Sequence, residues 1–227
     1  MRRIIATFVV TLFLALWVPN VRGQEWSDIV PISRTISVSA SGVGHTLQVL
    51  GDWGQRSCTA TGTVNTWDSW SETQVNTIGS VSIGTEVYPW VVQISAAAQF
   101  RTASRDLPGS WFDGDASIVF NIPGRAEPSF AFDVGGLCTC NTTLTGPSGQ
   151  VWWAGGGFDM SVESERPRFL DPGQYTLWMH IIPQTILGIS GSSNMTVRLG
   201  ISPAVPEPAT IGLASIGLLL LTRRPRR

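Results

Sequence analysis

Residues 171–182 read DPGQYTLWMHII, and this stretch decides the fold class of the chain. Its first three residues are a strong turn signal. After the turn, every second residue is apolar: Tyr175, Leu177, Met179 and Ile181. Because successive side chains of a strand point to opposite faces, this alternation predicts a β-strand over 174–182 with one face against a core.

The same short alternation recurs along the chain, with turn residues between the segments. Further strands are expected over 32–38, 47–49, 58–64, 74–83, 87–100, 117–122, 129–134, 151–153, 158–162 and 194–201. About ten short strands without a βαβ rhythm predict an all-β fold. We expect a two-sheet antiparallel β-sandwich of jelly-roll type.

Three local features modify this pattern. Trp67 to Trp70 are expected to form a loop between two strands, and the glycine run Gly155–Gly157 is expected to separate two others. Ala96 to Ala98 are compatible with a short helix inside an otherwise extended segment, whereas Pro89 indicates an edge or a bend.

The N-terminal residues 1–23 have the order of a secretory signal peptide. Arg2 and Arg3 precede an apolar run over 4–18, and Gly23 offers a small residue at the cleavage point. We expect cleavage between Gly23 and Gln24, with a retained N-terminal helix as the alternative.

The C-terminal residues 205–227, VPEPATIGLASIGLLLLTRRPRR, combine three parts in a fixed order. Pro206, Glu207 and Pro208 come first, an uncharged run over 209–221 follows, and the last residues include four arginines. As a helix, the uncharged run is about 20 Å long, which is short for a permanent membrane span. The arginines favour the cytoplasmic side of a membrane.

This tail resembles the PEP-CTERM sorting signal. The resemblance implies an exosortase as processing partner, transient membrane attachment through the helix 209–221, and delivery to the cell surface or an exopolysaccharide-rich matrix. It also implies that Pro206, Glu207 and Pro208 form the processing signature and that Arg223 and Arg224 form a retention element. An ordinary anchor that is never cleaved is the alternative.

Between the two ends lies one expected exported domain, residues 24–204, which is long enough to bury a sizeable core. This part keeps eight arginines against fifteen acidic residues and has no lysine. Its surplus of negative charge argues against a nucleic-acid partner, because such partners require clustered positive charge.

Three cysteines, Cys58, Cys138 and Cys140, lie in the exported part, where disulfides can form. Cys58 can bond to either of the other two and close a long loop, leaving one thiol over. A bond between Cys138 and Cys140 requires strained geometry. No metal site or cofactor is expected from these cysteines.

Tryptophans are the leading candidates for binding. Trp67 and Trp70 in the expected loop, with Trp152 and Trp153 beside the glycine run, can stack on the apolar faces of sugar rings. Core packing is the alternative. Since Trp152 and Trp153 point to opposite faces of an alternating strand, at most one of them is expected at the surface.

Acidic pairs suggest two further chemistries. Asp113-Gly114-Asp115 is similar to the start of a calcium loop, but it is also a good turn. Glu163 and Glu165 share a face of a strand and can form a glycosidase pair, although a solvated edge neutralised by nearby arginines is the simpler interpretation.

The sequence therefore predicts an exported, non-enzymatic β-sandwich protein of the cell envelope or extracellular matrix. A carbohydrate-binding module is the main alternative, and a glycoside hydrolase on a lectin-like sandwich is the other. The two histidines, His45 and His180, are too isolated in the sequence to be nominated as a general base.

Overall fold

The computed structural model describes residues 28–101, 106, 112–136, 138–157, 160–183 and 191–204. The expected signal peptide and the sorting segment 205–227 lie outside these residues. The described part contains twelve strands and no helix. The strands are β1 (Val30–Ala40), β2 (Val43–Leu50), β3 (Gly54–Asp68), β4 (Thr73–Tyr88), β5 (Val91–Arg101), β6 (Phe112–Ile122), β7 (Ala126–Gly136), β8 (Cys138–Gly146), β9 (Gly149–Gly157), β10 (Met160–Glu163), β11 (Gly173–Pro183) and β12 (Gly191–Pro203).

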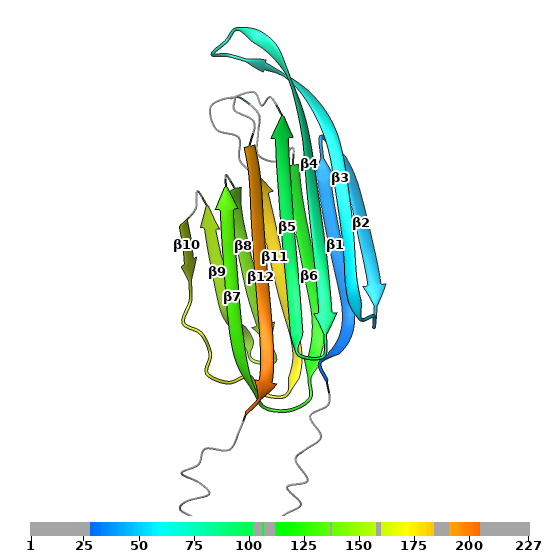
Figure 1. The fold of residues 1–227 in the computed structure, drawn as a ribbon, viewed down its shortest axis with the longest axis vertical. Coiled ribbons are helices and arrows are strands. Elements are labelled where there is room, and N and C mark those ends of the chain that lie inside the picture. Colours follow the sequence, from blue (N-terminus) through cyan, green and yellow to red (C-terminus); the bar gives the residue numbers. More distant parts are fainter. Residues whose placement is uncertain are drawn as a thin grey trace, which may run out of the picture.

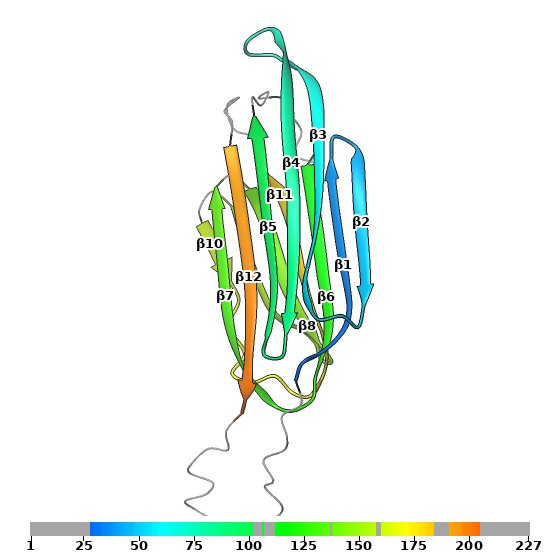
Figure 2. The ribbon, with the colours of Figure 1, turned by 45° about the vertical axis from the view of Figure 1, so that its right-hand side comes forward.

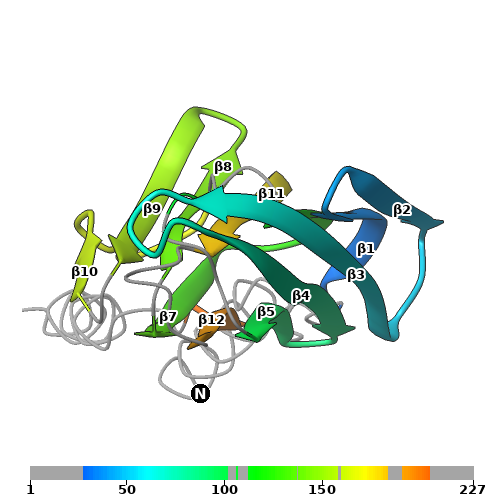
Figure 3. The same ribbon diagram turned by 90° about the horizontal axis from the view of Figure 1, so that it is seen from above.

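The strands form two sheets that face one another (Figures 1 and 3). The seven-stranded sheet has the order β10-β9-β8-β11-β6-β1-β2, and the five-stranded sheet has the order β3-β4-β5-β12-β7. All pairings are antiparallel. The predicted two-sheet antiparallel sandwich is confirmed, whereas the finer jelly-roll assignment stays a prediction.

Late strands complete both sheets. β11 lies between β6 and β8, and β12 lies between β5 and β7. Each therefore joins segments that are far apart in the sequence, and the local turn signals give no indication of these neighbours. Half of the ten strand pairings among the described residues join strands that are not consecutive in the chain, and such non-local pairing is expected to slow folding.

The core lies between the inner faces of the two sheets. On β11 the predicted face is confirmed, because Tyr175, Leu177, Met179 and Ile181 are all buried. The sheets approach one another closely near the end of β5, where Phe112 packs edge-on against Phe100 with ring centroids 4.8 Å apart. A Cβ on Gly79 would overlap the Phe112 ring, so the residue is glycine because the opposite sheet fills that space.

The sequence predicted that the glycine run separates two strands. Instead, the run forms the last three residues of β9. A Cβ on Gly157 would lie 2.7 Å from the Cys138 carbonyl oxygen, and one on Gly155 would lie 2.8 Å from Oδ1 of Asn141. The glycines at the end of β9 thus permit the close approach of β8.

Three other segments are extended where the sequence leaves a helix, a turn or a loop open. Ala96 to Ala98 are extended within β5, Asp113 to Asp115 belong to β6 rather than to a turn, and Trp67 is the penultimate residue of β3. In each case sheet pairing continues through residues whose local sequence permits a turn or a helix, because tertiary context overrides weak local preference.

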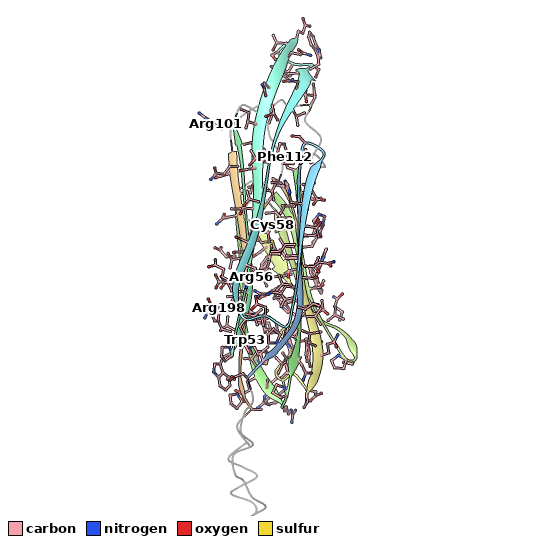
Figure 4. All side chains as sticks on the ribbon, turned by 90° about the vertical axis from the view of Figure 1, so that its right-hand side faces the viewer. Trp53, Arg56, Cys58, Arg101, Phe112 and Arg198 are labelled. Carbon is pink, nitrogen blue, oxygen red and sulfur yellow. The ribbon has the colours of Figure 1, made fainter. Side chains whose placement is uncertain are left out.

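The predicted disulfide is absent: no disulfide joins the three cysteines, all of which the structure describes. Cys58 is half-buried on β3 at the edge of the five-stranded sheet, with its Sγ 4.0 Å from the His45 carbonyl oxygen (Figure 4). Cys138 and Cys140 are buried on β8 in the other sheet. Hydrogen bonding to Cys138, followed by burial, raises the pKa of Cys140 far above its ordinary value.

No helix within the described ranges is long and apolar enough to cross a membrane. The apolar segment 209–221, which the sequence predicts as a membrane helix, is not among those ranges.

One buried charged side chain connects the two sheets beside the crossover from β2 to β3. Arg34 on β1 is 2% exposed. Its guanidinium donates to the carbonyl oxygens of Gly54 at 2.8 Å and Asp52 at 2.9 Å, and it reaches the Thr85 carbonyl at 3.4 Å. The Asp52 carboxylate lies 3.3 Å away and also pairs with Arg56. Arg34 thus joins a strand of the seven-stranded sheet to the 51–54 crossover and to β4 of the other sheet.

Replacing Arg34 is expected to destabilise the whole sandwich. Arg34→Met keeps much of the side-chain volume but leaves the partly buried carbonyls of Asp52 and Gly54 and the buried carbonyl of Thr85 without this donor. It should lower the free energy of unfolding by about 2–4 kcal/mol. Urea denaturation measures this change. Arg198→Met is the matched control, because Arg198 is exposed on β12, and its effect should stay within about 0.5 kcal/mol. Equal midpoints for the two variants would contradict the structural role of Arg34.

Candidate functional site

The outer face of the seven-stranded sheet carries a row of aromatic and hydroxyl side chains. Cross-strand register places Trp153 of β9 opposite Thr143 of β8, Thr143 opposite Trp178 of β11, and Trp178 opposite Ser117 of β6. Because neighbouring strands lie about 4.8 Å apart, the two tryptophan Cα atoms are about 10 Å apart. Trp153 is exposed and Trp178 is half-buried, so both indoles belong to a flat sheet surface.

A second, polar row lies directly beside the first. Asn141 of β8 is opposite His180 of β11, which is opposite Asp115 of β6. Asp113 lies two residues before Asp115 and projects from the same face of the strand. His180 Nε2 is 2.6 Å from Asp113 Oδ1, and one ligand atom from each of Asp113, Asp115 and His180 lies within 4.8 Å of the others.

Two opposing sets of interactions determine the ionisation of Asp115. Burial raises its pKa above the ordinary value, and the neighbouring Asp113 charge raises it further. His180 and a hydrogen bond from Trp178 lower the pKa, but they do not cancel the rise. The Trp178 and His180 rings are 5.9 Å apart, so the aromatic and polar rows are in contact at β11.

Sequence reasoning missed this cluster. The sequence suggests the start of a calcium loop or a turn at Asp113 and Asp115 and gives His180 no neighbour, yet β11 and β6 are paired along this length. The available signal was that all three residues occupy polar positions of alternating segments. It was insufficient because nothing local shows that the two segments are neighbours.

The second candidate surface is the tip of the β3–β4 hairpin. Strand β5 pairs with β4 only from Ile78 onward, so β3 and β4 continue beyond it as a two-stranded ribbon, 64–68 paired with 73–77. This ribbon arches past the end of the sandwich (Figures 1 and 3). Trp67, at 58% exposure, and Trp70, at 76%, lie at its tip. The predicted surface position of both tryptophans is thus observed.

Hydrogen bonds order the turn of the hairpin. Ser71 Oγ donates to the Asp68 carboxylate, and the Ser69 backbone N–H donates to Asp106 Oδ2 at 2.6 Å. These bonds from Ser69 lower the pKa of Asp106 below its ordinary value. The tip is therefore connected to a carboxylate in the distant segment between β5 and β6.

The opposite end of the sandwich, the base, holds both ends of the described domain. Ile29 N–H donates to the Pro89 carbonyl at 3.0 Å, and Ile201 N–H donates to the Trp90 carbonyl at 2.9 Å, so both ends meet the β4–β5 turn. Ala204 N–H donates to the Arg125 carbonyl in the β6–β7 turn. Figure 2 shows the end of β12 at the base, opposite the hairpin tip.

The remaining predicted sites are not brought together. The prediction of Trp152 as a glycan contact is wrong, because Trp152 is 1% exposed and stacks on Phe130 with ring centroids 4.6 Å apart. Its neighbour Trp153 is 39% exposed, which confirms that only one of the pair reaches the surface. Because Trp153 lies on the side face, it does not form one surface with Trp67 and Trp70.

The glutamate pair also lacks the predicted geometry. Strand β10 ends at Glu163, so Glu165 is beyond the strand and the two do not share a strand face. Glu163 accepts a hydrogen bond from Arg166 Nη2 at 2.8 Å, and both carboxylates are exposed. This agrees with a solvated, neutralised edge.

The comparison with known families concerns the C-terminal tail. The family profile described as the PEP-CTERM protein-sorting motif matches residues 204–227. These residues are a PEP-CTERM sorting motif. The motif implies an exported protein that is transiently anchored in a membrane and has an exosortase as processing partner. No curated protein and no solved structure matches the chain.

The tie between the tip and Asp106 should depend on pH. A lowered pKa means that the ionised carboxylate is favoured in the folded state, so its contribution is present at neutral pH and is lost as pH falls through the lowered value. Amide hydrogen exchange at Ser69 should show constant protection from neutral pH down to the ordinary aspartate range and reduced protection below it. Asp106→Ala should remove this protection at every pH. Equal protection in the variant at neutral pH would show that the bond does not order the tip.

Proposed function

We propose that this chain is an exported, non-catalytic binding protein of the cell envelope or extracellular matrix, and that it contacts neutral glycan through Trp67 and Trp70. The observation that carries the proposal is the placement of two exposed indoles at the end of the sandwich opposite the start of the sorting motif.

The position of the hairpin tip relative to the sorting motif supports this function. The motif begins at Ala204, whose N–H bonds to the β6–β7 turn at the base. While the chain is anchored, the base is the end nearer the membrane. The hairpin tip is the far end, where a surface protein meets material outside the cell.

The chemistry of the tip supports a sugar ligand over a charged one. Indole rings cover the apolar faces of pyranose rings, and hydroxyl, amide and carboxylate groups beside them accept and donate hydrogen bonds to sugar hydroxyls. The hairpin 64–77 supplies such groups at Ser69, Ser71 and Gln74. It carries Asp68 and Glu72 but no basic residue, so anionic lipid and nucleic acid are repelled.

Two alternatives make different demands on the molecule. A carbohydrate-binding face on the side of the sandwich would use the row of Trp153 and Trp178 instead of the tip. A glycoside hydrolase would require a carboxylate pair, and the exposed, arginine-paired Glu163 supports a structural role for that residue.

The binding test compares two sets of tryptophan variants in the full chain. The probe is the producer's own extracellular polysaccharide, and binding is followed by intrinsic tryptophan fluorescence and by co-sedimentation. The double variant Trp67→Ala, Trp70→Ala should bind at least about tenfold more weakly, because each stacked indole contributes about 1 kcal/mol or more to the binding free energy. Trp153→Ala, the matched control on the side face, should bind like the unmodified chain.

Other outcomes reject the proposal in distinct ways. Loss of binding in Trp153→Ala alone would move the contact to the side face. No binding by the unmodified chain would leave a purely structural or protein-contacting role. Release of reducing ends from the polysaccharide, lost in Glu163→Gln, would establish the hydrolase.

A further inference from the structure

The polar row on the side of the sandwich has the composition of a metal-ligand set. Asp113 and Asp115 project from one face of β6, and His180 projects from the paired position of β11. Their nearest ligand atoms all lie within 4.8 Å of one another. Three different positions on two rigid, adjacent strands thus offer two carboxylate oxygens and one imidazole nitrogen at a single point.

The charge around these residues is unbalanced. The two carboxylates lie side by side, and the only arginine on β1, β6, β8 or β11 is Arg34, whose buried guanidinium is committed to the crossover at the base. His180 is therefore the only described basic side chain on these strands that faces the pair. Two carboxylates held this close to one another repel. A bound cation would remove this repulsion.

A neighbouring tryptophan orients one of the three side chains. Trp178 donates a hydrogen bond to Asp115, and the cross-strand neighbours of the cluster are Ser37, Ser39 and Asn141. A hydrogen bond of the kind that Trp178 makes to Asp115 orients a metal ligand and tunes its affinity. The side chains of Asp113 and His180 are 38% and 26% exposed, so the cluster is open on its solvent side.

The distances suit a small transition-metal ion. Ligand atoms about 2.1 Å from a tetrahedral zinc ion are about 3.4 Å from one another. The 2.6 Å pair of His180 Nε2 and Asp113 Oδ1 must open by less than about 1 Å, which a small side-chain rotation supplies. Calcium is the poorer candidate, because it takes six to eight oxygen ligands and imidazole is not one of them.

We propose that Asp113, Asp115 and His180 bind one divalent transition-metal ion of the zinc class through two carboxylate oxygens and one imidazole nitrogen, with water completing the coordination. The sequence suggests only the start of a calcium loop or a turn at Asp113 and Asp115, and it does not bring His180 to them, because His180 lies 67 positions after Asp113. The site is independent of the proposed glycan contact, which lies at the hairpin tip.

The test uses zinc itself as the probe. The full chain is solubilised in detergent, treated with chelator and titrated with Zn²⁺ by isothermal calorimetry. One zinc per chain is expected. Asp115→Asn and His180→Gln, which preserve shape, should each weaken binding at least about tenfold, since each removes a ligand. Asp133→Asn, on the outer face of the other sheet, is the matched control and should bind zinc unchanged.

Two further readouts separate binding from misfolding. Zinc should raise the thermal midpoint of the unmodified chain and of Asp133→Asn, but not those of the ligand variants. Cobalt in place of zinc should give the visible absorption of a four-coordinate site only in the chains that retain all three ligands. Equal zinc affinity in Asp115→Asn and the unmodified chain, or absence of binding by a folded unmodified chain, would overturn the proposal.

Discussion

The sandwich depends on the buried guanidinium of Arg34. A sheet buries its apolar face only if another layer packs against it, and here that layer is the second sheet. The chain crosses from one sheet to the other at residues 51–54. The backbone carbonyls of that crossover would otherwise lack donors. Arg34 supplies them and also reaches Thr85 of β4, so one side chain satisfies the crossover and connects both layers.

The two ends of the sandwich differ. At the base, the β4–β5 turn accepts backbone hydrogen bonds from Ile29 and Ile201, so the two ends of the described domain lie together. At the other end β3 and β4 outlast β5 and extend beyond the body as a ribbon. A PEP-CTERM motif attached at the base therefore distinguishes the membrane-proximal end of the exported domain from the distal end. The most exposed of the described tryptophans lie at the distal end.

Period-two alternation in the sequence was sufficient to predict the fold class and most strands. It predicted the buried face of β11 correctly, because burial of one face is a property that each strand carries alone. It did not predict which strands are neighbours, and for that reason the meeting of His180 with Asp113 and Asp115 was missed. The register of a sheet depends on contacts between distant segments, and a single sequence does not display them.

Predictions from local residue preferences failed where packing between strands determines the structure. Gly155 and Gly157 are typical of a break, but they lie in β9 because β8 approaches too closely for a side chain. Trp152 is typical of a binding platform when it is seen beside Trp153, but alternation buries it against Phe130. The sequence predicted that only one of the two tryptophans would be exposed, and only the structure determines which.

The central claim is that the anchored protein holds its base near the membrane and its hairpin tip away from it. Along β3 the two ends are about 45–50 Å apart, which is within the range of fluorescence energy transfer. The full chain, with Cys58, Cys138 and Cys140 replaced by alanine, would be labelled at the exposed positions Ser69→Cys or Arg125→Cys and reconstituted in vesicles that contain an acceptor lipid. The account predicts strong transfer from position 125 and weak transfer from position 69. Equal transfer from the two positions would contradict it.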